Sequence, residues 1–566
     1  MKKLFTKTLL TSASVAIILG GCTNLNTKHT YLALGNEVAT KCASLTAEVA
    51  KTEIGIPSGV ATIDSATWVA ATDLVVAERG PTPASRVSPA TPAHCKILGR
   101  IAPVDPAAPP ILFQVNLPSQ WNGRSVQYGG GGFNGTLINA VGLPPAQRFD
   151  TASPLAQGYV TLGTDSGHQT GAKDTPQAFA LNAEALENFA HASYKKVRDV
   201  ALVITQRAYG RRPDKLYFMG SSEGGREGLT MAQRYPNDFD GIFSRVPVIS
   251  WTGLQHAGLR DGLAIRGDAW LSPAHTKLVH ESVLAACDAA DGLVDGLIAD
   301  PIGCRQRFDV TKLRCAGNAS NTCLTDAQIK AVQTLHAPLK MPINLANGIS
   351  EYPGRGPSGE DIPSFGPTGG WQSWWLGTEP PAFPSKMSNG IAWFYGAGAI
   401  QYFYARDPNA DLTRYSMQAN ASRVLEVSNL MDSTNPDLSQ FHAHGGKLVI
   451  LEHLSDYAQS PYAGIEYFAK VQEKMGIANT KKFARLFAAP GVDHVGAGAP
   501  ANVDMLSVLV DWVERNKAPE TLEVAEQEVK APFSVKRALP LCQWPLWPRY
   551  KAGPMHLASS YECASN

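Results

Sequence analysis

The stretch Leu216-Tyr-Phe-Met-Gly-Ser-Ser-Glu-Gly-Gly-Arg226 constrains the fold more than any other part of the chain. Its apolar first half predicts a buried strand, and residues 227–234 predict a helix. The five residues from Gly220 to Gly224 between them have the G-x-S-x-G spacing of a nucleophile elbow, which lifts one serine, Ser222, above a sheet. Such a turn needs glycines because a Cβ would collide with neighbouring backbone. The strand and helix around it favour this interpretation over an ordinary glycine-rich turn.

Strands and helices alternate in the first part of the chain. Apolar runs at residues 111–115, 125–128 and 159–165 predict strands, and the amphipathic segment 186–209 predicts a helix. This alternation is typical of an α/β fold with a mostly parallel sheet.

Four consecutive glycines follow the second of these strands, in Gly129-Gly-Gly-Gly-Phe-Asn-Gly135. Glycines there let backbone N–H groups approach a ligand closely. We predict that this loop supplies half of an oxyanion hole, and that the N–H of Glu223, after the nucleophile, supplies the other half. A phosphate-binding loop is disfavoured because no G-K-[ST] follows, and a flexible turn is the remaining alternative.

The alternation stops near residue 249, and the next 190 or so residues are rich in Pro, Gly and Trp. We therefore predict a hydrolase-like core in two parts, residues 22–249 and 441–566, with an inserted lid domain at residues 250–440. Residues 371–404 of the insertion are unusually aromatic. These rings could form a small core of their own, or line a site for an apolar or aromatic substrate.

Candidate partners for the serine lie in the second part of the core. A predicted strand at 445–451 leads to Asp456, and a predicted strand at 482–488 leads to His494. An acid after one strand and a histidine after the next, in the chain order Ser…Asp…His, are what an α/β-hydrolase triad requires. His556 lies in a Cys- and Pro-rich tail, and Asp493 is too close to His494 in sequence to orient its ring.

Three carboxylates in the insertion, Asp288, Asp291 and Asp295, alternate with Gly292 and Gly296. Such a cluster is repulsive unless a hard cation such as Ca²⁺ binds it through oxygen ligands. The spacing differs from that of an EF-hand, so we predict another kind of calcium loop. An acidic surface turn is the alternative.

The N-terminus predicts export. Three lysines precede an apolar stretch at 9–19, which ends in Leu19-Gly-Gly-Cys22 and is similar to the lipobox of bacterial lipoproteins. We expect residues 1–21 to be a signal peptide and Cys22 to be lipidated, so that the lipid anchors the exported protein to a membrane. Resemblance to known lipoproteins favours the outer membrane. A plain secretory signal is the alternative. Because the net charge is +1, nothing indicates a nucleic-acid partner.

Eight cysteines follow Cys22, an even number that favours disulfides in an oxidising compartment. Proximity in the sequence favours the pairs Cys315–Cys323 and Cys287–Cys304. No C-x-x-C occurs, which counts against a zinc ribbon or a redox motif.

These motifs together resemble the tannase/feruloyl esterase family over nearly the whole mature chain. The resemblance rests on the glycine loop, the elbow with its continuation to Gly228, the loop 287–300, Asn435-Pro-Asp-Leu-Ser439, and Cys542 with Cys563. It implies that Ser222 is the nucleophile, His494 the base and Asp456 the group that orients it. It also implies oxyanion donors at Glu223 and Gly132, and no organic cofactor.

The resemblance further implies a structural Ca²⁺ in the lid, bound by the carboxylates of Asp288, Asp291 and Asp295 and by the carbonyls of Leu293 and Leu297. The implied disulfides are Cys42–Cys95, Cys287–Cys304, Cys315–Cys323 and Cys542–Cys563. Family members commonly bridge the positions just before the serine and just after the histidine, but these are Ser221 and Val495 here. We expect packing and hydrogen bonds to hold the serine and histidine together instead.

The resulting expectation is a serine carboxylic ester hydrolase for small aromatic acyl esters, of feruloyl-esterase type. Hydrolysis of galloyl esters, as by tannases, and of mono(2-hydroxyethyl) terephthalate are close alternatives. The same triad could also serve amide or lactone hydrolysis. A non-catalytic binding lipoprotein is disfavoured because the serine, aspartate, histidine and glycine loop are all present.

Overall fold

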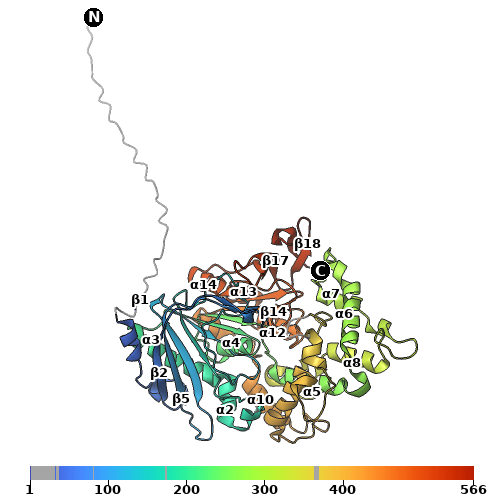
Figure 1. Cartoon of the computed structure of the whole chain (residues 1–566), viewed down its shortest axis with the longest axis horizontal. Helices are drawn as coiled ribbons and strands as arrows, with labels where there is room; N and C mark the ends of the chain where they lie inside the picture. Colours follow the sequence, from blue (N-terminus) through green and yellow to red (C-terminus); the bar gives the residue numbers. More distant parts are fainter. Residues whose placement is uncertain (2–31, 34–36, 81, 172–174, 363–368, 566) are drawn as a thin grey trace. The chain divides into compact units, whose positions relative to one another are not determined.

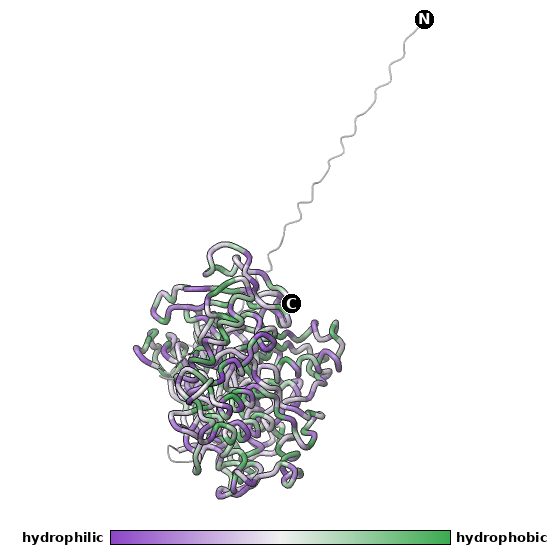
Figure 2. The backbone as a smooth tube through the Cα atoms, turned by 90° about the vertical axis from the view of Figure 1, so that its right-hand side faces the viewer, coloured by the Kyte–Doolittle hydropathy of each residue, from purple (hydrophilic) through white to green (hydrophobic). Residues whose placement is uncertain are grey.

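The computed structural model describes residue 1 and residues 32–33, 37–80, 82–171, 175–362 and 369–565, and residues 31–566 form one compact unit. The predicted signal peptide and Cys22 lie outside the described residues. Hydrophilic and hydrophobic positions are interspersed throughout the described part (Figure 2). Among the helices of these residues, none has the length and apolar character needed to cross a membrane.

One large sheet organises the unit. In the described part of the chain it has eleven strands in the order β16-β17-β15-β14-β11-β10-β8-β9-β6-β5-β2. The six strands from β15 to β9 are mutually parallel, and the strands beyond them at both edges are antiparallel. The strands of this sheet, in chain order, are β2 (Ala61–Val69), β5 (His94–Ile101), β6 (Ile111–Pro118), β8 (Arg124–Tyr128), β9 (Val160–Thr164), β10 (Lys215–Ser221), β11 (Gly241–Arg245), β14 (Lys447–His453), β15 (Ala484–Ala489), β16 (Leu522–Gln527) and β17 (Val535–Gln543).

Helices of the core pack against this sheet. Residues of α3 and α4 are buried in the same apolar clusters as the strands, and α14 packs on the opposite cluster with β11 and β14. The core helices are α1 (Val38–Ala43), α2 (Ala183–Glu187), α3 (Ser193–Tyr209), α4 (Glu223–Arg234), α12 (Pro461–Met475), α13 (Ile477–Phe483) and α14 (Met505–Arg515). Short two-stranded pairings complete the unit: β1 (Leu32–Ala33) with β7 (Gln120–Trp121), β3 (Val75–Val76) with β4 (Val87–Ser88), and β18 (Trp547–Tyr550) with β19 (Tyr561–Ala564).

The segment between β11 and β14 is mainly helical. Figure 1 shows its green and yellow helices gathered together at the side of the unit away from β2 and β5. They are α5 (Trp251–Ala264), α6 (Pro273–Cys287), α7 (Pro301–Arg307), α8 (Asp326–His336), α9 (Ile391–Ala399), α10 (Ala421–Met431) and α11 (Ser439–His444), with the short pair β12 (Leu339–Lys340) and β13 (Glu351–Tyr352). Part of the segment has an apolar cluster of its own, which includes Trp371 and Trp375. The division into core and lid at residues 250 and 440 stays a prediction.

The structure corrects several predicted boundaries. The elbow helix α4 begins at Glu223, four residues before the predicted start, because the turn itself enters the helix. The predicted helix at 186–209 is α2 and α3 joined by a π-helical turn at Asn188–Ala192. The predicted strand at 482–488 begins later, since α13 continues to Phe483 and β15 starts at Ala484. The antiparallel strands β2 and β5 have no counterpart in the prediction.

Four disulfides join the eight described cysteines. They are Cys42–Cys95, Cys287–Cys304, Cys315–Cys323 and Cys542–Cys563. These are the four pairs that the family resemblance implied.

Candidate active site

Ser222 lies at a strained turn between β10 and α4. Its backbone has φ 61° and ψ −120°, a conformation that a non-glycine residue adopts only when its surroundings enforce it. A Cβ on Gly220 would overlap the carbonyl of Gly224, and a Cβ on Gly224 would lie 2.7 Å from the carbonyl oxygen of Gly130. The glycines of the predicted elbow therefore allow the close backbone packing that the turn requires.

The structure brings the three predicted residues together. The Nε2 atom of His494 lies 2.9 Å from Ser222 Oγ, and its Nδ1 atom lies 2.6 Å from Asp456 Oδ2. The other carboxylate oxygen of Asp456 accepts the backbone N–H groups of Ala458 and Gln459 at 2.7 and 3.0 Å. These bonds fix the carboxylate, which in turn fixes the plane and tautomer of the imidazole.

Polar contacts hold the histidine loop. Asp493 shapes this loop: its Oδ1 accepts the N–H groups of the three residues 495–497 at 2.7–3.1 Å. The Nδ1–H of buried His453 donates to the Asp493 carbonyl at 2.6 Å. Arg245 Nη2 donates to the His494 carbonyl at 3.2 Å, and Arg245 Nε points at His453 Nε2 at 3.4 Å.

Burial perturbs this cluster. It lowers the pKa of Arg245 to about 10 and, with the nearby Arg245 charge, lowers the pKa of His453 well below its usual value. Neutral His453 can then use Nδ1 as donor and Nε2 as acceptor. Ser221 and Val495, the two positions without cysteine, line one cavity of about 380 Å³ together with Arg245.

The glycine loop lies against the start of α4. The Gly130 carbonyl accepts the N–H of Gly224 at 3.1 Å, and Gly132 has φ +58°, a left-handed conformation suited to glycine. Within the described part of the chain, the N–H groups of Gly132 and Glu223 have no hydrogen-bond partner, and both residues line the cavity that contains Ser222 and His494. Their free donors match the predicted oxyanion hole.

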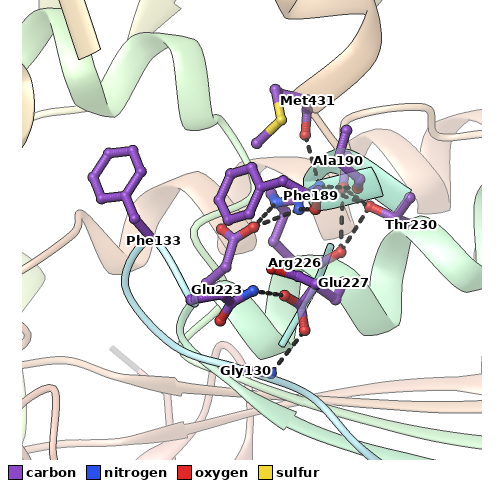
Figure 3. A network of polar contacts seen from close by, with 12 residues as sticks. Gly130, Phe133, Phe189, Ala190, Glu223, Arg226, Glu227, Thr230 and Met431 are labelled. Atoms are coloured by element: carbon purple, nitrogen blue, oxygen red, sulfur yellow. Dashed lines mark hydrogen bonds and ion pairs between the residues drawn. The ribbon is translucent and has the colours of Figure 1, made fainter. Parts of the chain in front are cut away.

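Behind this loop lies a buried ionic network (Figure 3). Glu223 turns its side chain away from the cavity and pairs with Arg226, whose guanidinium also donates to the carbonyls of Ala190 and Met431. The Glu227 carboxylate, one helical turn further on, faces the glycine loop and accepts the N–H of Gly130 at 2.8 Å. The sequence analysis missed this role of Glu227. The signal was a charged residue among the glycines at the start of the predicted helix, directly after an apolar strand.

A cavity of about 200 Å³ opens above Ser222. Its walls are largely apolar and aromatic, and its polar side chains other than the catalytic candidates include the Gln255 amide and the Tyr395 hydroxyl. The lining residues are Gly131, Gly132, Phe133, Ser222, Glu223, Val248, Trp251, Leu254, Gln255, Trp374, Tyr395, Ala458, His494 and Val495. The aromatic run divides into two groups: Trp374 and Tyr395 line the cavity, whereas Trp371, Trp375 and Phe403 are buried in the core.

The acidic loop is folded by its own hydrogen bonds. Asp288 accepts the N–H groups of residues 295 and 296, Asp291 that of Leu293, and Asp295 that of Leu297. Asp295 also pairs with Arg537 at 2.5 Å. Burial and the neighbouring carboxylates raise the pKa of Asp291 to about 6. Within the described ranges, no three His, Cys, Asp or Glu side chains are grouped in a way that could hold a metal ion.

The parallel sheet, the elbow serine after β10, and the aspartate and histidine after β14 and β15 define an α/β-hydrolase. Residues 95–564 match the family model described as tannase and feruloyl esterase. The chain therefore belongs to the tannase and feruloyl esterase family, and it is a carboxylic ester hydrolase.

Individual relatives agree with this assignment. The chain is 33% identical over 573 residues to an uncharacterized esterase of Agrobacterium fabrum, covering 99% of both chains. It is 31% identical to the mono(2-hydroxyethyl) terephthalate hydrolase of Piscinibacter sakaiensis, covering 87% of this chain and 88% of that one. Among solved structures, an esterase from Aspergillus oryzae superposes with a TM-score of 0.75 at 25% identity, covering 93% of this chain and 100% of the other.

Proposed function

We propose that this esterase hydrolyses small esters of aromatic acids, of feruloyl-esterase type, with Ser222, His494 and Asp456 as its catalytic triad. The observation that carries the proposal is the line of hydrogen bonds from Asp456 through His494 to Ser222 at the floor of a cavity with aromatic walls. The family and its relatives support ester hydrolysis, and the cavity supports an aromatic acyl group.

In the proposed mechanism, His494 Nε2 takes the Ser222 proton as the hydroxyl oxygen attacks the ester carbonyl. Asp456 stabilises the imidazolium that forms. The negative charge on the former carbonyl oxygen is met by the N–H groups of Glu223 and Gly132. The alcohol leaves with the proton from His494, and a water molecule, activated by the same histidine, then hydrolyses the acyl-enzyme.

The cavity walls favour a neutral aromatic acyl group. Rings of Phe133, Trp251, Trp374 and Tyr395 can pack on an aromatic substrate, and the Gln255 amide can bond a ring hydroxyl or methoxy group. A terephthalate monoester would bring a second carboxylate into this lining, where desolvation is costly without a cationic partner. We therefore rank hydroxycinnamoyl esters first, and galloyl and terephthalate esters after them.

The test is a hydrolysis panel on residues 23–566 with methyl ferulate, methyl gallate, mono(2-hydroxyethyl) terephthalate and p-nitrophenyl butyrate, with Ser222→Ala as control. We expect the highest kcat/KM on methyl ferulate, and its loss in Ser222→Ala. Preference for the terephthalate ester or the gallate would select that alternative. Turnover of the aliphatic ester alone would refute the aromatic acyl site, and no Ser222-dependent turnover would favour a binding lipoprotein.

We also propose that the acidic loop binds Ca²⁺ through Asp288, Asp291 and Asp295, with the carbonyls of Leu293 and Leu297. The support is the burial of Asp288 and Asp291. Burial, and then repulsion from Asp295 and Asp288, raise the pKa of Asp291. Two observations oppose it: Asp295 pairs with Arg537, and among the described residues the three carboxylates do not form a group that could hold a metal ion. We expect Tm to be higher in CaCl₂ than in EGTA, and this difference to be smaller in Asp291→Asn. An unchanged Tm would show that Arg537 and the backbone hydrogen bonds suffice to hold the loop.

Export and lipid anchoring at Cys22 complete the proposal. Four disulfides support folding in an oxidising compartment. Labelling of the full-length chain with radioactive palmitate, lost in Cys22→Ser, would support the anchor. Labelling of neither would indicate a plain secretory signal.

A further inference from the structure

We propose that Glu227 is a positioning residue of this esterase: its carboxylate holds the glycine loop in the geometry that lets Gly132 bind the oxyanion. The inference rests on the proposed function, because it assigns the means by which one half of the oxyanion hole is kept in place. Glu227 itself does not line the cavity with Ser222, so it acts through the loop.

The carboxylate gathers three donors from two segments. Its Oε2 accepts the Gly130 N–H at 2.8 Å, and its Oε1 accepts Asn134 Nδ2 at 2.8 Å and the Tyr194 hydroxyl at 2.5 Å. The Asn134 side chain then turns back and accepts the Gly131 N–H at 2.7 Å. Both N–H groups that precede Gly132 are thus directed away from the cavity, towards Glu227 and its partner.

This arrangement leaves the next N–H for the reaction. In the part of the chain that the structure describes, the Gly132 N–H has no partner, while those of Gly130 and Gly131 are bonded behind the loop. Since Glu227 belongs to the second turn of α4 and Ser222 precedes the first, the helix connects the nucleophile rigidly to the loop anchor. The distance between the nucleophile and the oxyanion donor is then set by α4 and by the loop that Glu227 binds to it.

The surrounding glycines serve this contact. A Cβ on Gly129 would lie 2.7 Å from the Gly224 Cα and 3.0 Å from Glu227 Oε2, and a Cβ on Gly130 would overlap the Asn134 side chain. At these two positions glycine is needed for close approach of the loop to α4. The sequence interpretation, in which the glycine run admits a ligand, therefore applies to Gly132 and not to the whole run.

Only a carboxylate can satisfy all three donors. A glutamine offers one acceptor oxygen, so its NH₂ group would face either the Gly130 N–H or the pair from Asn134 and Tyr194. Glu227 is fully buried, so water cannot replace the lost acceptor. Arg226, which lies between the carboxylates of Glu223 and Glu227, offsets part of their charge.

The decisive variant is Glu227→Gln, measured at pH 8 on residues 23–566 beside Tyr194→Phe. The second variant removes one donor to the same carboxylate, together with the 3.1 Å bond from Asn134 Nδ2 to the Tyr194 hydroxyl. It leaves both bonds between Glu227 and the loop. For Glu227→Gln we expect kcat to fall by about 10- to 100-fold with KM within about threefold of wild type, a partial loss of an oxyanion donor. Tyr194→Phe should stay within about threefold in kcat, since Glu227 keeps its bonds to Gly130 and Asn134.

A second readout is independent of ester turnover. The rate at which a fluorophosphonate labels Ser222 also needs the oxyanion hole, and we expect it to fall in Glu227→Gln by the same factor as kcat. If the wild type is labelled but turns over no ester, the proposed function is overturned. The role of Glu227 is then decided by comparing the labelling rates of the wild type and the two variants. Unchanged kcat and labelling in Glu227→Gln, or an equal loss in Tyr194→Phe, would overturn the inference, as would absence of wild-type labelling.

Discussion

Replacing Gly132 by alanine tests the oxyanion hole most directly. The backbone at this position has φ +58°, and an alanine held there is strained by about 1–2 kcal/mol. The new Cβ would also lie 3.0 Å from the Tyr395 hydroxyl oxygen, closer than ordinary van der Waals contact. Both effects push the loop or the tyrosine away, and either shift moves the Gly132 N–H from the position that the oxyanion needs.

The magnitude follows from the value of one such donor. Complete loss of an oxyanion-hole donor costs about 2.7–4 kcal/mol, or roughly 10²–10³ in kcat. Because Gly132→Ala displaces the donor without removing it, we expect about half of this free energy, a fall in kcat of about 10- to 30-fold. KM should change little, since the donor acts on charge that develops in the transition state.

The chain offers a matched control one residue away. A Cβ on Gly131 meets no described atom within 4 Å, and its φ lies outside the left-handed range, so Gly131→Ala should keep kcat within about twofold. The assay is steady-state kinetics on the best ester of the panel, with Tm for each variant. Equal losses in both variants, or a kcat of Gly132→Ala within about twofold of wild type, would refute the assignment. Adding Tyr395→Phe to Gly132→Ala should restore the part of the loss that comes from the hydroxyl contact.

Three further predictions follow from buried polar groups. Arg245→Met removes the donors to the His494 carbonyl and to His453 Nε2, so kcat should fall by about tenfold. Tm should hold or rise, because the variant removes a desolvated charge. A lower Tm with normal kcat would contradict this prediction. Gln255 is 5% exposed and lines the cavity, and its side-chain amide has no hydrogen-bond partner among the described residues. Gln255→Leu should therefore raise KM about tenfold for methyl ferulate but not for methyl cinnamate, and equal effects on both esters would argue against ring recognition. Burial, and then the Glu223 charge, raise the pKa of Glu227 from 4.5 to about 7, so the stability that its neutral form contributes is present below pH 4.5 and lost as pH rises to about 7. In urea unfolding, the free energy of unfolding of Glu227→Gln should therefore increase relative to that of wild type as the pH rises through this window, by about 1.4 kcal/mol or less per pH unit. A difference that does not change with pH would contradict this prediction.

Local patterns in the sequence were sufficient for the catalytic candidates. The elbow, the apolar runs before Asp456 and His494, and the order of the three residues are features of short segments, and short segments carry their own strand, turn and helix signals. For the disulfides, proximity in the sequence favoured only Cys315–Cys323 and Cys287–Cys304, and the family resemblance supplied the full set of four pairs. Boundaries at the elbow and at β15 were less accurate because the turn and α13 extend regular structure beyond the local signal.

The partners of the buried charges were decided by the tertiary structure. Arg245 reaches the histidine loop because β11, β14 and β15 pair in parallel, with Arg245 opposite Leu451 and His453 opposite Ala489. The separate strands do not encode this register. Glu227 meets Gly130 across 97 residues of chain, when the glycine loop packs against α4. A charged residue in an apolar segment shows that a partner must exist, since an unpaired buried charge is too costly. Which partner it finds depends on the packing of strands and helices, and that packing is a property of the whole folded chain.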